Sequence, residues 1–133
     1  MVFLDTNILL YAFDLHPESQ LKRVIARELL LDRPHVSVQA LTEFGAVRRR
    51  KCGEDPAAIA EKINFLLGWC TSHDLSSQIL LEALDLADRY QLSHFDSLMI
   101  ANALHRGGEM LLTEDLHSGL VIAGRLQILN PFV

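Results

Sequence analysis

Four acidic side chains of this chain stand where a predicted helix or strand begins or ends. Asp5 and Asp115 each follow a short apolar run that is typical of a buried strand. Asp96 begins an almost entirely apolar helical stretch, and Glu43 lies about one turn into another predicted helix. Each acid also has an ordinary structural explanation, because aspartates cap helices and turns and a helical glutamate can be an exposed charge. If the four side chains converge, however, they form a site that can bind a cation.

Glu43 fits the structural explanation least well. Its neighbours on the same helical face are Ala40, Ala46 and Val47, so the carboxylate lies on a small apolar face without a basic partner. Four converging acids repel one another strongly, and a bound divalent cation removes this conflict. Oxygen ligands alone favour Mg²⁺ or Mn²⁺ over zinc. Two such ions, about 3.5–4 Å apart, can activate a water molecule and stabilise a leaving oxygen in phosphodiester hydrolysis.

The elements that must bring these acids together alternate between short strands and helices. We predict four strands, at residues 2–4, 35–38, 110–112 and 126–129. Helices are predicted at residues 8–13, 20–33, 39–51, 56–70, 76–90 and 96–104. This alternation indicates an α/β fold with a mostly parallel sheet, covered on both faces, whose strand ends share one edge. No linker is apparent, so residues 1–133 are predicted to form a single domain.

Apolar spacing also predicts which side of two of these helices faces the core. In the second helix the inward residues would be Leu21, Val24, Ile25 and Leu29. In the fifth they would be Leu80, Ala83, Leu84 and Ala87.

Composition excludes several classes of protein. Hydrophobic residues make up 50% of the chain, which excludes a disordered low-complexity segment, and no segment recurs at a fixed period. No apolar run approaches the roughly 18 residues of a membrane-spanning helix, and we expect no secretion signal. Cys52 and Cys70 form no CxxC pair, so we expect reduced thiols in a cytoplasmic protein without zinc.

The charges are unevenly distributed along the chain, whose net charge is −5. Residues 22–51 carry eight basic and three acidic side chains, whereas residues 74–115 carry eight acidic and two basic ones. Such a protein can hold phosphates with its basic side and cations with its acidic cluster.

Four short motifs, in order along the whole chain, make this sequence similar to a known family. They are Phe3-Leu4-Asp5-Thr6-Asn7, Ser37-Val38-Gln39-Ala40-Leu41-Thr42-Glu43-Phe44, Phe95-Asp96-Ser97-Leu98-Met99-Ile100-Ala101 and Leu112-Thr113-Glu114-Asp115-Leu116, with Asn130-Pro131-Phe132 closing the chain. The chain resembles the PIN-domain ribonucleases, and most closely the VapC-type toxins of bacterial toxin–antitoxin pairs. The resemblance implies a PIN-like three-layer α/β/α sandwich around a short, mostly parallel sheet.

The resemblance also implies roles for individual residues. The catalytic, metal-binding acids would be Asp5, Glu43, Asp96 and Asp115. Asn7 and Thr113 match polar positions that support them. Of the two adjacent acids in the last motif, we expect Asp115 to be the ligand and Glu114 to face solvent.

The implied activity is Mg²⁺-dependent endonucleolytic cleavage of RNA. Asp5 and Asp96 would hold the principal metal, while the other two acids complete a second site or orient the attacking water. Mn²⁺ is expected to substitute for Mg²⁺. The implied partners are the RNA substrate, a second copy of the chain in a homodimer, and a small antitoxin whose C-terminal segment lies across or near the acidic pocket.

The basic run Arg48-Arg49-Arg50-Lys51 has two interpretations. It is either a solvated helix end whose cations complement the helix dipole, or a set of phosphate contacts beside the acids. Arg50 lies seven residues after Glu43, about 10 Å along the same helix face, which suits an RNA backbone that enters the site.

Two other classes of function remain open at the level of sequence. One is an aspartate-based phosphotransfer domain, of receiver or haloacid-dehalogenase type. The latter needs a second aspartate where this chain has Asn7, both need a late lysine, and no lysine follows Lys62. The other is a non-catalytic binding module of the same fold that acts through a protein partner. A nuclease assay with and without Mg²⁺ separates these hypotheses.

Overall fold

The computed structural model describes residues 1–133. Its elements are β1 (Val2–Leu4), α1 (Thr6–Phe13), the 3₁₀ helix η1 (Pro17–Ser19), α2 (Gln20–Leu31), β2 (His35–Ser37), α3 (Val38–Cys52), α4 (Pro56–Trp69), β3 (Thr71–His73), α5 (Ser77–Tyr90), α6 (His94–His105), β4 (Met110–Leu112), β5 (Val121–Ile122) and β6 (Leu126–Leu129). None of the helices is both long and apolar enough to cross a membrane.

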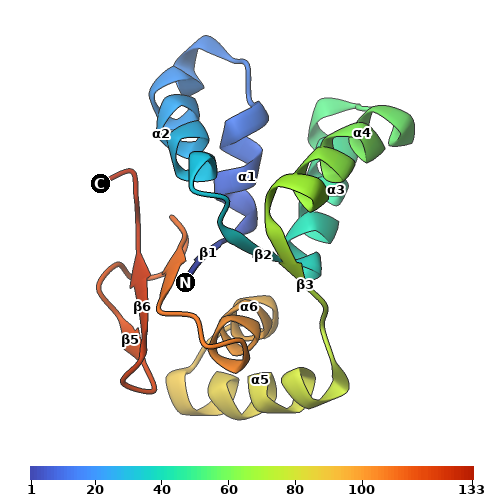
Figure 1. Cartoon of the computed structure of the whole chain (residues 1–133). Coiled ribbons are helices and arrows are strands. Elements are labelled where there is room, and N and C mark those ends of the chain that lie inside the picture. Colours follow the sequence, from blue (N-terminus) through green and yellow to red (C-terminus); the bar gives the residue numbers. More distant parts are fainter.

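The six strands form one sheet between two layers of helices (Figure 1). The strand order is β3-β2-β1-β4-β6-β5, and every neighbouring pair is parallel except β5 with β6. Helices α1 to α4 lie on one side of the sheet, and α5 and α6 pack together on the other (Figure 1). The prediction of a three-layer α/β/α sandwich around a mostly parallel sheet is therefore confirmed.

Strands β1 and β4 lie side by side in the middle of the sheet. Their side chains Phe3, Leu4, Leu111 and Leu112 are buried, because helices cover both faces of these apolar strands. Helix α6, whose sequence is almost entirely apolar, is buried from residue 97 to residue 104. Since parallel strands end at the same edge, β1 and β4 bring together the polar residues that follow them.

Side-chain caps determine where several helices begin. The side chains of Ser37 and Asp55 accept backbone N–H bonds at the starts of α3 and α4, and Gly53 ends α3 with φ of 62°. The helices predicted at residues 39–51 and 56–70 are therefore confirmed to within one residue at each end. Helix α6, however, begins at His94 and is capped by Ser93, whose hydroxyl accepts the Asp96 N–H. The carboxylate of Asp96 is therefore not the cap of its helix.

Two of the six strands, β3 and β5, were not expected from the sequence. The residues of β3 are Thr71, Ser72 and His73, and two of these three are exposed at the edge of the sheet. Strand β5 has only two residues and pairs antiparallel with β6. Neither strand carries the buried apolar run on which the strand prediction depends, because edge strands need not be covered on both faces.

The predicted inward face of α2 is only partly right, because Leu29 packs against the core and Ile25 is half-buried, but the other two residues are exposed. Leu21 is 74% exposed and Val24 is 47% exposed, whereas Ala26 and Leu30 are buried. Helix α2 packs against α1, and an Arg27 Nε hydrogen bond of 2.8 Å to the Ala12 carbonyl also joins the two helices.

The predicted face of α5 is similarly rotated. Leu80 and Leu84 are exposed, Ala83 is buried as predicted, and Ile79 and Leu86 are the other buried residues of this helix, which packs against α6.

Candidate active site

The register of β1 and β4 places Asp5 beside Thr113 at the carboxyl edge of the sheet. Leu4 pairs with Leu112, so the residues that follow them are neighbours across the ladder. Thr113 Oγ1 donates a 2.7 Å hydrogen bond to Asp5 Oδ2, and the Thr6 amide donates a 2.6 Å bond to Asp5 Oδ1. Both carboxylate oxygens are thus fixed, one by the neighbouring strand and one by the first residue of α1.

Asn7 and the Thr113 hydroxyl connect Asp5 to Asp115. Asn7 Nδ2 donates to Thr113 Oγ1 at 3.2 Å and to Asp115 Oδ2 at 3.0 Å. The Asp115 amide also donates to Thr113 Oγ1, at 3.1 Å. The two residues predicted to support the acids therefore lie between the first acid and the last one. Asp115 itself is exposed and borders the site on the solvent side.

Glu43 joins this group through Thr6, the residue next to Asp5. Thr6 Oγ1 lies 2.9 Å from Glu43 Oε2, and Gln39 Nε2 donates to Glu43 Oε1 at 3.1 Å. As expected, no basic side chain pairs with this carboxylate. Both partners are neutral, so they satisfy the oxygens of Glu43 without balancing its charge.

Gln39 joins the start of α6, where Asp96 lies, to the helix that carries Glu43, but Asp96 itself contacts none of the other three acids. The same Gln39 amide that binds Glu43 also donates a 3.0 Å hydrogen bond to the carbonyl of Phe95, the residue before Asp96. Asp96 is partly buried in the first turn of α6, and its carboxylate accepts no hydrogen bond within the chain. This acid is consequently the least constrained of the four.

The electrostatic environment disfavours a negative charge on Asp5. Burial raises the pKa of its carboxyl group from 3.8 to about 6, although the hydrogen bonds from Thr113 and Thr6 act in the opposite direction. The charges of Asp115 and Glu43 raise this pKa further, which shows that the three carboxylates interact. A cation bound among them would relieve the repulsion.

The chemistry of these residues fits a hard divalent cation, but the site is not closed around one. All the candidate donors are carboxylate, hydroxyl or amide oxygens, as Mg²⁺ prefers. In addition, Gln39 Oε1 is buried beside Glu43 without a hydrogen-bond partner. No three carboxylate, imidazole or thiolate side chains come close enough together to hold an ion. The four-acid metal site thus stays a prediction.

Glu114 does not face solvent as predicted. Its carboxylate accepts a 2.6 Å hydrogen bond from Tyr11 Oη and pairs with Lys22 Nζ at 2.9 Å. These contacts hold it against α1 and α2. Asp115 is the acid of this pair that Asn7 connects to the site.

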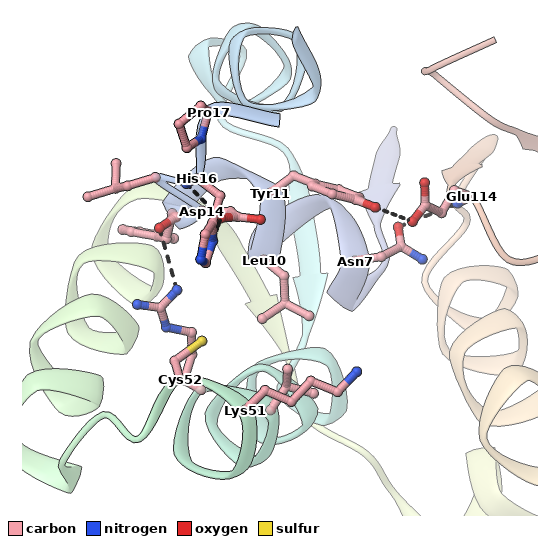
Figure 2. A pocket seen from close by; sticks show the side chains of 13 residues that line it. Asn7, Leu10, Tyr11, Asp14, His16, Pro17, Lys51, Cys52 and Glu114 are labelled. Carbon is pink, nitrogen blue, oxygen red and sulfur yellow. Dashed lines mark hydrogen bonds and ion pairs between the residues drawn. The ribbon is translucent and has the colours of Figure 1, made fainter. Parts of the chain in front are cut away.

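A cavity of about 730 Å³ adjoins this group of acids along α1 and α3. Asn7 and Glu114 lie at one end of the cavity, whereas Lys51 and Cys52 lie on α3 (Figure 2). Leu10 projects between them, so the floor of the cavity is partly apolar (Figure 2). None of the four acids lines this cavity, which meets the site at Asn7 and is large enough for part of an extended ligand.

The basic run at the end of α3 is divided between two environments. The Arg48 guanidinium forms a two-point ion pair with Glu54, at 2.9 and 3.2 Å, and its side chain is only 14% exposed. The structure therefore commits Arg48 to its own chain, contrary to the expectation that it contacts RNA. Arg49, Arg50 and Lys51 are exposed.

Sequence reasoning missed Thr6 and Gln39 as residues of the site. A signal for Gln39 was present, because a glutamine four residues before Glu43 on a helix faces the same side. Thr6 carries no comparable signal, since its contact with Glu43 joins residues 37 positions apart.

Comparison with known proteins agrees with this arrangement. The sequence matches the PIN domain family over residues 2–117. The chain belongs to the PIN domain family. A search of the curated proteins finds no match to it. Among solved structures, a toxin–antitoxin complex from Klebsiella pneumoniae aligns with a TM-score of 0.72 and 19% identity, over 98% of each chain.

Two further structures show the same fold. VapC20 of Mycobacterium tuberculosis, a toxin that cleaves the sarcin–ricin loop, has a TM-score of 0.69 and 17% identity, over 84% of this PIN chain and 87% of its own. VapBC2 of Rickettsia felis, bound to a DNA fragment from its promoter, has a TM-score of 0.65 and 21% identity, over 98% and 100%.

Proposed function

We propose that this PIN domain is a Mg²⁺-dependent endoribonuclease and the toxin of a type II toxin–antitoxin pair. The observation that carries the proposal is the connected group at the sheet edge, in which Asp5, Asp115 and Glu43 interact through short polar side chains. Relatives of the same fold are a toxin that cleaves ribosomal RNA and toxins in antitoxin complexes, which supports this choice of substrate and partner.

Each residue of the group has a part in the proposed reaction. Asp5 and Asp96 would hold the principal ion, and Asp115 and Glu43 would complete a second site or orient the attacking water. When bound, the ion would polarise the phosphate group and lower the pKa of a water molecule. Thr113 and Thr6 keep the Asp5 oxygens in place, so that little reorganisation is needed when the substrate arrives. The nucleophile would be water, so no side chain need attack the phosphate.

The proposed partners occupy different parts of the surface. Arg49, Arg50 and Lys51 would contact the RNA backbone, since they are exposed at the end of the helix that carries Glu43. The cavity next to Asn7 offers room for the C-terminal segment of an antitoxin. We also propose a homodimer, because α5 exposes Leu80, Leu81 and Leu84.

The direct test is cleavage of a structured RNA by the purified chain. We expect cutting with Mg²⁺ or Mn²⁺, none in excess EDTA, and none by an Asp5→Asn variant. Unchanged cleavage in EDTA would exclude a metal-dependent reaction. RNA binding without cleavage in Mg²⁺ would instead indicate the non-catalytic binding module.

A further inference from the structure

Glu114 is held by a set of contacts that its sequence neighbours at the site do not share. Tyr11 Oη donates to Glu114 Oε1 at 2.6 Å, and Lys22 Nζ lies 2.9 Å from Glu114 Oε2, so each oxygen of this carboxylate has its own partner. Figure 2 shows the Tyr11 side chain of α1 reaching across to Glu114. The partners come from α1 and α2, which are distant in sequence from the loop after β4.

Aromatic rings cover the cation of this group. Lys22 Nζ lies 3.2 Å from Tyr11 Oη, 4.8 Å from the centre of the Tyr11 ring and 5.3 Å from the centre of the Phe132 ring. The Tyr11 and Phe132 rings pack edge to face, with their centres 5.2 Å apart. The last residues of the chain therefore help to hold Lys22 against Glu114.

The position of Glu114 matters because it lies between two residues of the site. Thr113 bonds to Asp5, Asp115 bonds to Asn7, and the Glu114 amide points to Asn7 Oδ1 at 3.4 Å. The Glu114 side chain is bound to residues of α1 and α2, whereas the side chains of Thr113 and Asp115 on either side of it face the acids. Without these contacts, a longer carboxylate next to Asp115 would be free to compete for the same cation.

We propose that Tyr11 and Lys22 form a clamp on Glu114 that positions Asp115 for metal binding and keeps the Glu114 carboxylate out of the metal site. This inference rests on the proposed function, since it assigns the clamp to the same metal site. Glu114, Tyr11 and Lys22 are positioning residues in this scheme, and Asp115 is the ligand.

Metal affinity measured without RNA tests the clamp. We would titrate Mn²⁺ into metal-free protein by calorimetry and compare the wild type with Tyr11→Phe and Lys22→Met. Residues that orient metal ligands typically change affinity by about 10–100-fold, so we expect a loss of about tenfold in each variant. Tyr11→Phe leaves the charge and the ring packing intact, whereas Lys22→Arg keeps a cation for Glu114 and should restore most of the affinity.

A matched control is Lys62→Met. Lys62 also pairs with a glutamate, Glu54, and it is similarly half-buried, but this ion pair joins α4 to the end of α3. Its loss should lower the melting temperature without changing Mn²⁺ affinity, which separates the clamp from a general loss of stability.

Two results would overturn the inference. One is a wild-type Mn²⁺ affinity in both Tyr11→Phe and Lys22→Met. The other is a Glu114→Gln variant that loses far more Mn²⁺ affinity than Tyr11→Phe and Lys22→Met, and as much as Asp115→Asn, because Glu114 would then be a ligand itself. A wild-type protein that binds Mn²⁺ but cuts no RNA would contradict the proposed function. The effect of the clamp on Mn²⁺ affinity could still be measured in that case.

Discussion

Replacing Asp5 by asparagine should stabilise the metal-free protein at neutral pH. A folded-state pKa of about 6, raised from 3.8, favours the folded state below pH 3.8, and this contribution disappears as the pH rises through 6. The difference of about 2 pKa units corresponds to about 3 kcal/mol of unfolding free energy, present at pH 3 and absent at pH 7. Asparagine keeps the shape and one hydrogen-bond acceptor, so we expect a net gain of about 1–3 kcal/mol at pH 7.

The assay is urea unfolding in EDTA at pH 7 and at pH 4, for the wild type and Asp5→Asn. The gain should be largest at pH 7 and close to zero at pH 4, where the wild-type carboxyl group is largely protonated. Asp55→Asn is the matched control, because Asp55 also caps a helix but is exposed. Mg²⁺ should then stabilise the wild type and not Asp5→Asn. If Asp5→Asn lowers stability equally at both pH values, the electrostatic account of this site is wrong.

Three further predictions follow from the same contacts. The double variant Arg49→Ala, Lys51→Ala should weaken RNA binding equally for all RNA sequences. The slope of log affinity against log salt concentration should fall by about one unit per lost phosphate contact. An unchanged slope would show that these residues only form a solvated helix end. Arg48→Ala should lower the free energy of unfolding in denaturant by about 1–3 kcal/mol, because Glu54 then loses one of its two ion-pair partners. An unchanged free energy of unfolding would mean that this ion pair does not stabilise the protein. Light scattering at micromolar concentration should give the mass of a dimer, and Leu81→Glu on α5 should shift it to a monomer; a wild type that is purely monomeric would contradict the proposed interface.

Much of the fold follows from local sequence signals. The apolar runs of β1 and β4 and the αL residue Gly53 act over a few positions, and β1, β4 and the end of α3 lie where the sequence predicts them to within one residue. The parallel sheet then follows from the alternation of strands and helices, because such strands need helical crossovers. This topology alone brings Asp5 next to Thr113.

The errors concern contacts between residues that are distant in sequence. Helix α2 packs against α1, and the periodicity within α2 does not record that Ala26 and Leu30 become its most buried residues. Likewise, Glu114 appears exposed in its own motif because its partner Lys22 lies 92 residues away. Strand β3 is polar because it lies at the sheet edge, so it lacks the apolar signature of a buried strand.

The central claim is that four acids share one metal site, and Asp96 tests it most directly because its carboxylate accepts no hydrogen bond within the chain. The measurement is the rate of RNA cleavage by the wild type and Asp96→Asn over a range of Mg²⁺ concentrations. The account predicts that the wild type cuts with saturable dependence on Mg²⁺ and that Asp96→Asn, although folded, does not cut. An Asp96→Asn variant that cuts RNA with the wild-type Mg²⁺ dependence would contradict it.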